Sequence, residues 1–317
     1  MEFTQLLKFV GIFSVAFSFC YIATVPTIRT AFSVGAVDVP RDDRRMHTSA
    51  TARCGGIAIF SAFTVAVLCY NRGKLSSLSG AILSGGAIIA ALGFCDDVTP
   101  LPPRLKLLGE LFVSIIPLAF GIYASEISVF GFSVPLPFFI SLLLSSLWIV
   151  TVTNALNLID GLDGLAAGVG FIASLTVFAR LFFSSPPTDA LVIPLALAGA
   201  LLGFLPHNTK KAKIFMGDCG SLLLGYCLSV LTLVGNPSST GAGGSFSVLP
   251  SFLILAYPLC DTLFAVFRRA KSKKGIFTAD KKHIHHRLCA RGYTKSKAAF
   301  ILVFLSAVFC VLSLLFR

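Results

Sequence analysis

The feature of this sequence that most limits its fold is a series of long apolar segments. Most of them run for about 16 to 23 residues, which is the length that a helix needs to cross a lipid bilayer. Only 13% of the residues are charged, about half the share found in soluble domains. The sequence therefore predicts an all-α, polytopic integral membrane protein and argues against a soluble helical one. The ten expected spans cover residues 4–26, 54–70, 78–95, 107–123, 138–153, 165–183, 190–206, 221–235, 246–267 and 299–316.

Positive charges indicate how these spans are oriented. The loops after odd-numbered spans hold 21 of the 26 Lys and Arg residues, whereas the loops after even-numbered spans hold only Arg72 and Lys74. Because positively charged loops stay in the cytoplasm, we expect the odd loops to be cytoplasmic and both termini to lie outside, in the inner or plasma membrane. The net charge of +12 then reflects topology and anionic ligands, not nucleic acid. We expect one membrane-embedded domain over residues 1–317, with no separate soluble domain.

Carboxylates are scarce, and they gather on the same side as the positive charges. Ten of the fourteen Asp and Glu residues lie in or beside the odd loops. Acids at a membrane boundary are costly to desolvate, so their retention there suggests a function.

The second odd loop begins with two adjacent carboxylates, Asp96 and Asp97, followed by Arg104 and Lys106. Such a pair could bind a divalent cation or accept a proton, because like charges this close raise the pKa of one of them. The alternative is a structural cap of the preceding helix, or an ion pair with the nearby Arg and Lys.

The third odd loop reads NALNLIDGLDGLAAG, in which Asn154, Asn157, Asp160 and Asp163 recur every three residues. On an α-helix neighbours at this spacing share a face, but all four cannot. The amides suit a sugar or amide group, and the carboxylates suit a metal or a hydroxyl group. The alternative is that Asp160 or Asp163 caps the sixth span.

The fourth odd loop reads KKAKIFMGDCGS and places Asp218 among glycines, close to a group of lysines. One carboxylate can hold Mg²⁺ when phosphate and water supply the other ligands. Phe215 could stack on a nucleobase. The alternative is a topology-setting basic loop with a capping Asp.

The fifth odd loop ends in a dense group formed by His283, His285, His286 and Arg287. Their spacing, with no fourth ligand in view, argues against zinc, and phosphate binding fits better. The lysines ahead of them could simply face lipid headgroups. For Asp261, just upstream, an ion pair with Arg268 or Arg269 and a direct role both remain open.

The first odd loop carries several basic residues, among them Arg45 and His47, ahead of Gly55-Gly56. Phosphate binding and a topology signal are equally compatible with them. Taken together, the five loops predict one active site at the cytoplasmic face, with metal-assisted phosphoryl chemistry. Glu110, the acid well inside the fourth span, is a further candidate because burial of an acid there is costly.

Six motifs occur in an order that resembles the polyprenyl-phosphate N-acetylhexosamine-1-phosphate transferases. They are VDVPRDDRRMH with the following GG, DDVTPLPPRLKLLGE, NALNLIDGLDGLAAG, FMGDCGSLLLG, PLCDTLFAVFRR and DKKHIHHRL. The resemblance covers about residues 37–290. It implies transfer of a sugar 1-phosphate from a UDP-N-acetylhexosamine to a polyprenyl phosphate such as undecaprenyl phosphate, with release of UMP. That would be the first membrane step of cell-envelope polysaccharide assembly.

The resemblance also implies roles for individual residues. Asp218, with Asp97, would bind Mg²⁺, for which Mn²⁺ could substitute, and Asp96 or Asp97 would deprotonate the lipid phosphate. Asp160 and Asp163 join them as catalytic groups. The implied substrate-binding residues are Asn154, Asn157, Phe215, Lys106, His283, His285, His286, Arg287, Arg45 and His47. The short HIHHRL form resembles the branch that uses small donors such as UDP-GlcNAc.

Other readings stay open at this point. The donor could be UDP-GalNAc, a UDP-linked deoxy-aminosugar or UDP-MurNAc-pentapeptide, and the reaction could run in one step or through an aspartyl-phosphate. A lipid transporter or flippase would show charges along its spans and inverted repeats, which this sequence lacks apart from Glu110. A homodimer is also compatible. Two departures from the family pattern are Ala52, where proline is usual, and Glu110, where glutamine is usual.

Overall fold

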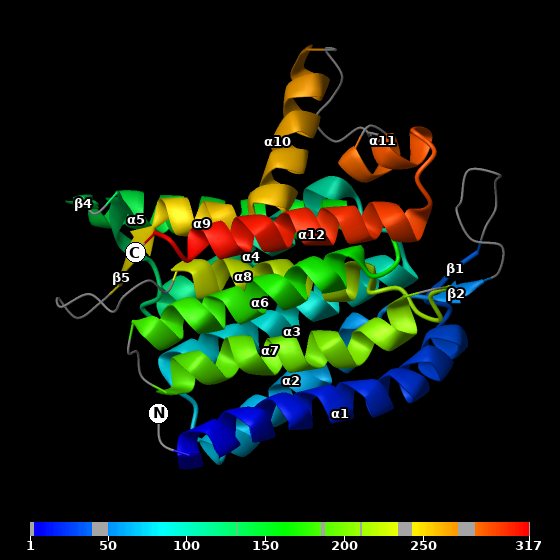
Figure 1. Ribbon diagram of the computed structural model, residues 1–317, viewed down its shortest axis with the longest axis horizontal. Helices are drawn as coiled ribbons and strands as arrows, with labels where there is room; N and C mark the ends of the chain where they lie inside the picture. Colours follow the sequence, from blue (N-terminus) through cyan, green and yellow to red (C-terminus); the bar gives the residue numbers. More distant parts are fainter. Residues whose placement is uncertain are drawn as a thin grey trace.

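The computed structural model describes residues 3–39, 50–130, 132–184, 188–209, 211–233, 243–271 and 283–316. Helices make up most of this part of the chain (Figure 1). They are α1 (Phe3–Val34), α2 (Gly56–Asn71), α3 (Ser77–Val98), α4 (Pro103–Ala119), α5 (Phe138–Ile159), α6 (Leu165–Phe183), α7 (Thr188–Asn208), α8 (Gly217–Leu233), α9 (Val248–Ile254), α10 (Ala256–Lys271), α11 (Ile284–Ala290) and α12 (Lys295–Ser313).

The helices agree with a protein that crosses a membrane several times. Within the described residues, α1, α3, α5, α6, α7 and α12 are each long and apolar enough to span a bilayer, and the bent pair α9–α10 would make a seventh if it counts as one span. Helices α2 and α8 are apolar but shorter. Each of the ten predicted spans coincides with a helix or with this bent pair. The number of ten transmembrane helices itself stays a prediction.

The ninth predicted span, 246–267, is not one straight helix. It is divided into α9 and α10, which meet at an angle of 87°, and α10 stands away from the bundle (Figure 1). Pro258 offers a physical cause, because its ring cannot accommodate the carbonyl four residues earlier, and that residue, Ile254, is where α9 ends. Within the first turn of α10 the proline is tolerated.

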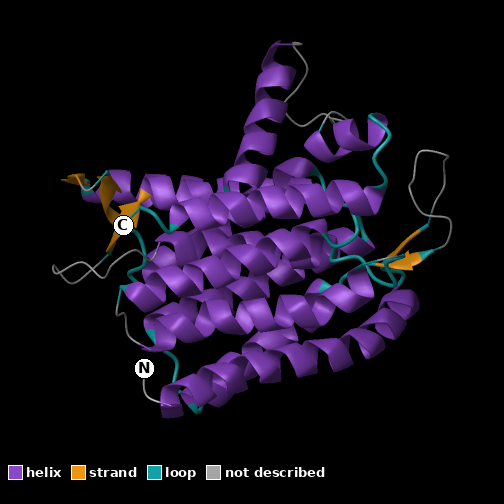
Figure 2. Cartoon of the chain, viewed as in Figure 1, coloured by secondary structure: helices purple, strands orange, loops and turns teal. Residues whose placement is uncertain are grey.

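The expectation of an all-α fold needs a small correction, because short strands lie at both ends of the bundle (Figure 2). At one end β1 (Val37–Asp38) pairs antiparallel with β2 (Thr51–Ala52). At the other, β3 (Ala124–Val129) lies between the antiparallel β4 (Phe132–Pro135) and the parallel β5 (Gly244–Ser247). Between these two ends lie the long apolar helices.

The two ends of the molecule are therefore different. Figure 1 shows both chain termini at one end of the bundle, together with β4 and β5, and shows β1, β2 and α11 at the opposite end. The described parts of the first four odd loops, and α11 from the fifth, lie at this second end. Their common location is what a single active site requires.

Helix α8 lies at the centre of the bundle, with nearly every residue buried. Close approach of its neighbours depends on glycine. A Cβ on Gly56 of α2 would lie 2.3 Å from the backbone nitrogen of Gly220, and a Cβ on Gly93 of α3 would lie 2.4 Å from the carbonyl carbon of Asp218. The small residues thus bring α2 and α3 against the first turn of α8, which carries the candidate metal ligand.

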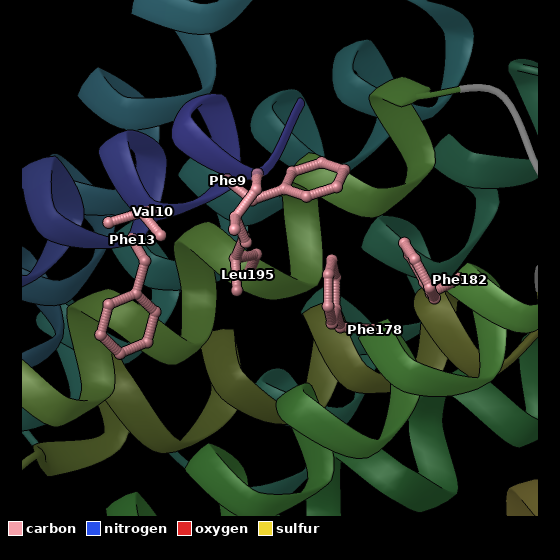
Figure 3. A pocket seen from close by; sticks show the side chains of 7 residues that line it. Phe9, Val10, Phe13, Phe178, Phe182 and Leu195 are labelled. Carbon is pink, nitrogen blue, oxygen red and sulfur yellow. The ribbon is translucent and has the colours of Figure 1, made fainter. Parts of the chain in front are cut away.

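An apolar cavity of about 380 Å³ lies between α1, α6 and α7. Figure 3 shows that its walls are aromatic and aliphatic, with Phe9 and Phe13 from α1 and Phe178 and Phe182 from α6. These residues belong to the start of α1 and the end of α6, whereas the first odd loop follows the end of α1 and the third odd loop precedes the start of α6. The cavity is therefore separate from the candidate active site.

Candidate active site

The site is organised around Asp97, which lies in the last turn of α3 and is buried. Its Oδ1 accepts a hydrogen bond from the backbone N–H of Asp218, and its Oδ2 accepts one from the N–H of Cys219, each at 3.0 Å. The first N–H groups of a helix have no partner within the helix, so Asp97 caps α8 from a neighbouring helix. Gly217 precedes them at φ +70°, where a Cβ would lie 2.4 Å from Asp97 Oδ2.

Lys106, at the start of α4, joins three of the predicted loops. Its Nζ donates to Asp218 Oδ2 and lies 3.4 Å from both Asp96 Oδ2 and Asn157 Oδ1. Asp96 also accepts a hydrogen bond of 2.6 Å from the backbone N–H of Leu101. The lysine is thus held by ion pairs to two carboxylates and does not project freely into solvent.

Asn157 orients the other side of the Asp218 carboxylate. Its Nδ2 donates to Asp218 Oδ1 at 3.0 Å and to Ser221 Oγ at 2.8 Å. Both partners lie on α8, whereas Asn157 comes from the end of α5. The structure therefore brings Asp96, Asp97, Lys106, Asn157 and Asp218 into one cluster.

Arg53, one of the basic residues of the first odd loop for which phosphate binding and a topology signal were equally open, completes this cluster. Its Nε lies 3.2 Å from Asp97 Oδ1, and its Nη2 lies 3.9 Å from Asp218 Oδ1. The segment before it is held to the fourth odd loop, because the N–H of Phe215 donates to the carbonyl of Ala52 at 2.8 Å. In the sequence, Arg53 lies just ahead of Gly55-Gly56. This position alone did not distinguish Arg53 from the other basic residues of the first odd loop.

The two aspartates of the third odd loop have different surroundings. Asp163 Oδ2 accepts a hydrogen bond of 3.3 Å from the N–H of Ala212 and so ties this loop to the fourth. Asp160 interacts electrostatically with Asp218 and Asp97, and burial first, then these charges, raises its pKa to about 8. Neither aspartate caps α6, because that position is Gly164, at φ +74° and without a side-chain cap.

Asn154 contacts a different acid. Its Nδ2 donates to Glu110 Oε2 and, at 2.9 Å, to the carbonyl of Val150. Glu110 is only 2% exposed, and its Oε1 has no hydrogen-bond partner in the described part of the chain. The structure therefore couples these two residues, and the substrate-binding role of Asn154 stays a prediction.

The histidines of the fifth odd loop lie on and beside α11. The His283 and His285 rings stack at a centroid distance of 5.7 Å, and His286 lies 4.3 Å from His285. Burial, assisted by His286, lowers the pKa of His285 to about 4, so this imidazole is neutral near pH 7. The partner of His283 is Asp261, at 2.8 Å. The sequence had offered Arg268 or Arg269 as partners for this aspartate.

The remaining predicted residues fall into two groups. Phe215 is half-buried and Arg287 is exposed, and their contacts with a base or a phosphate stay predictions. Arg45 and His47 lie in 40–49, outside the described residues.

The charges of the cluster suit a divalent cation. In the described residues, five carboxyl groups (Asp96, Asp97, Glu110, Asp160 and Asp218) interact with two cations, Lys106 and Arg53. No group of three or more His, Cys, Asp or Glu residues within the described ranges is arranged as a ready-made metal site. Mg²⁺ is commonly held by one or two carboxylates together with substrate phosphates and water, and Asp218 with Asp97 could supply that minimum.

Comparison with known proteins agrees with the motifs. A model of glycosyl transferase family 4 matches residues 79–236. The chain is 36% identical, over 99% of its length and 86% of the relative, to a Bacillus subtilis (strain 168) protein named "Probable undecaprenyl-phosphate N-acetylglucosaminyl 1-phosphate transferase".

Two further relatives carry related names. The decaprenyl-phosphate N-acetylglucosaminephosphotransferase of Mycobacterium tuberculosis (strain ATCC 25618 / H37Rv) is 36% identical over 89% of this chain and 76% of its own. The undecaprenyl-phosphate alpha-N-acetylglucosaminyl 1-phosphate transferase of Escherichia coli (strain K12) is 28% identical over 88% and 76%. The resemblance seen in the motifs is confirmed, and the chain belongs to the polyprenyl-phosphate N-acetylglucosamine-1-phosphate transferases of glycosyl transferase family 4.

Proposed function

We propose that this protein transfers N-acetylglucosamine 1-phosphate from UDP-GlcNAc to a polyprenyl phosphate, most simply undecaprenyl phosphate, and releases UMP. The names of the relatives support the acceptor and the transferred group. The observation that carries the proposal is the cluster in which Lys106 and Asn157 both contact Asp218, while Asp97 holds the start of the same helix. Residues from three separate loops meet there, with the charges that phosphoryl transfer requires.

The residues divide the work as follows. Asp218, with Asp97, would hold Mg²⁺, which neutralises charge on the pyrophosphate of the donor when it is bound. Lys106 and Arg53 place two positive charges beside these carboxylates, where they can pair with phosphate oxygens once substrate is present. Asn157 keeps Asp218 in one orientation through its Nδ2.

The proton acceptor is better assigned to Asp96 than to Asp97. Both oxygens of Asp97 already accept backbone hydrogen bonds, and Arg53 pairs with one of them. Asp96 accepts one backbone hydrogen bond on Oδ1, and its Oδ2 faces Lys106 at 3.4 Å. We therefore assign deprotonation of the lipid phosphate to Asp96, which would let a phosphate oxygen attack the β-phosphorus of the donor directly.

The site is proposed to face the cytoplasm, with both termini outside and the donor arriving from the cytosol. The distribution of Lys and Arg supports this orientation. Single cysteines at Arg104 and at Lys74 can be labelled in intact cells with an impermeant maleimide, in a background that lacks the other cysteines. Labelling of position 74 alone is expected, and labelling of position 104 from outside would reverse the assignment.

The reaction is tested with the purified protein, undecaprenyl phosphate and a panel of UDP-sugars that includes UDP-GlcNAc, UDP-GalNAc and UDP-MurNAc-pentapeptide. Release of UMP with UDP-GlcNAc, lost in EDTA and restored by Mg²⁺ or Mn²⁺, is the expected result. Release of UMP only with a different UDP-sugar would identify that sugar as the donor in place of UDP-GlcNAc. No UMP with any sugar would reject the enzyme assignment.

A further inference from the structure

Among the described residues, Asp261 is the most completely buried carboxylate outside the cluster that the mechanism uses. It lies on α10 and is 0% exposed, yet it accepts two hydrogen bonds. Its Oδ2 lies 2.8 Å from His283 Nδ1, and its Oδ1 accepts the backbone N–H of Ile284 at 2.8 Å. Burying a carboxylate is costly unless such bonds are made, so the arrangement is built for this pair of partners.

The two bonds determine which nitrogen of His283 carries a proton. The N–H of Ile284 can only donate, and an ionised carboxylate can only accept. Oδ2 of Asp261 therefore requires a hydrogen on Nδ1 of His283. The same requirement holds whether the ring is neutral or doubly protonated, and it leaves Nε2 as the ring atom able to interact with a ligand.

The position of the ring relative to the reaction centre is also given by these contacts. The His283 ring is stacked at 7° on His285, and the Nε2 of His285 lies 2.6 Å from where a Cβ of Gly161 would be. Gly161 follows Asp160, which interacts with Asp218. Asp261 thus anchors the histidine group against the loop that carries a candidate catalytic carboxylate.

The neighbouring histidine shows that this arrangement is specific to His283. His285 is also buried, but it interacts with Asp261 only through charge, and its Nδ1 lacks any hydrogen-bond partner among the described residues. Among the described residues, the charged and titratable groups that contact His283 are Asp261 from α10 and His285 from α11, with His286 next to the latter. Of these, only Asp261 can fix the position of a proton.

We propose that Asp261 is a positioning residue, which holds His283 as its Nδ1–H form and thereby keeps Nε2 free for a phosphate group of the substrates. The contact with phosphate rests on the proposed function, whereas the proton position does not. The arrangement is the one by which a buried aspartate fixes the tautomer of a catalytic histidine in hydrolases. It is reached here between residues 22 positions apart, on either side of 272–282.

Two substitutions separate positioning from structural support. Asp261→Asn keeps an oxygen for the N–H of Ile284 but turns an amide donor toward His283, so that the proton should move to Nε2. His283→Asn retains a donor near the place of Nδ1 and lacks Nε2 altogether. Both variants should keep the midpoint of thermal unfolding of the wild type within a few degrees, whereas Asp261→Ala, which removes both bonds, should lower it.

The measurement is nitrogen NMR of protein labelled with ¹⁵N-histidine, with His283 assigned by its loss in His283→Asn. The expected result is an Nδ1–H signal in the wild type and an Nε2–H signal in Asp261→Asn. UMP release should fall at least about tenfold in both variants, the scale of losing an orienting partner. Glu126→Gln, on β3 at the other end of the bundle, is the matched carboxylate control and should leave both readings unchanged.

The proposal would be overturned if His283 of the wild type carried its proton on Nε2. It would also be overturned if Asp261→Asn left the tautomer of His283 or the rate of UMP release unchanged. If Asp261→Asn does not fold, the assigned wild-type spectrum suffices for this decision, and His283→Gln replaces His283→Asn for the assignment if the latter does not fold. Should the wild type release no UMP from any UDP-sugar while the tautomers behave as expected, the proposed function fails and the positioning of His283 stands.

Discussion

Asp97 binds the backbone N–H of Asp218 with one carboxylate oxygen and that of the following residue, Cys219, with the other. The two aspartates come from different helices, so a side chain at the end of α3 fixes where α8 begins and where its candidate metal ligand lies. Two sequence motifs separated by more than a hundred residues are joined by this one contact.

Asp97→Asn should therefore lower both stability and activity. An amide has a single acceptor oxygen, so one N–H at the start of α8 would face a donor, at a cost of about 1–3 kcal/mol for an unsatisfied buried group. Thermal unfolding in detergent and UMP release are the measurements. Asp96→Asn is the control for stability, since an amide oxygen can still accept from Leu101. Equal unfolding midpoints for the two variants would contradict this account of Asp97.

Lys106→Gln should reduce the turnover number by about 10²–10³, the scale of losing one preorganised charge beside a reacting group. The lysine pairs with Asp218 and Asp96, and a glutamine would leave both carboxylates without that cation. Steady-state UMP release at saturating substrates measures the effect. Lys74→Gln, at an exposed position between α2 and α3, should behave as the wild type. A Lys106→Gln enzyme within twofold of the wild type would remove Lys106 from the proposed site.

The sequence predicted the helices well because bilayer-length apolar segments leave few alternatives. It could not predict the break between α9 and α10. Pro258 was visible, but prolines at positions 26 and 194 lie inside helices that continue. Whether a proline ends a helix depends on what packs around it, and that is a tertiary property.

The candidate site also contains residues that the sequence indicated and pairings that depend on the tertiary structure. Counting charges and reading motifs indicated Asp96, Asp97, Lys106, Asn157 and Asp218, and the structure places them together. Neither the role of Arg53 nor the pairing of Asp261 with His283 could be predicted from the sequence. Arg53 is one of five arginines in the first odd loop, and nothing in the sequence distinguishes it from the others. Whether Asp261 pairs with His283 or with the nearer arginines depends on the direction of α10.

Gly93→Ala should destabilise the protein, whereas Gly11→Ala should not. A Cβ on Gly93 would lie 2.4 Å from the backbone of Asp218, while a Cβ on Gly11 would meet no atom within 4 Å. The α3 and α8 backbones would have to separate, and overpacking of this kind costs about 1–3 kcal/mol. Thermal unfolding of both variants, with UMP release, tests the claim. A Gly93→Ala variant as stable and active as Gly11→Ala would show that the helices approach less closely than described.

Asp160 should make stability depend on pH when divalent cations are removed. Its pKa is raised from 3.8 to about 8, mainly by burial and then by the charge of Asp218. Between these two values the folded protein retains a proton that the unfolded chain has lost, so stability must fall as pH rises from about 4 and level off above about 8. Unfolding midpoints in EDTA from pH 5 to 9 should therefore decline more steeply for the wild type than for Asp160→Asn, which has no such proton to lose. Because a bound cation would favour the ionised carboxylate, saturating Mg²⁺ should flatten the wild-type curve toward that of the variant. Parallel curves for the two proteins in EDTA would mean that Asp160 is ionised throughout and lies in a more polar environment than its contacts indicate.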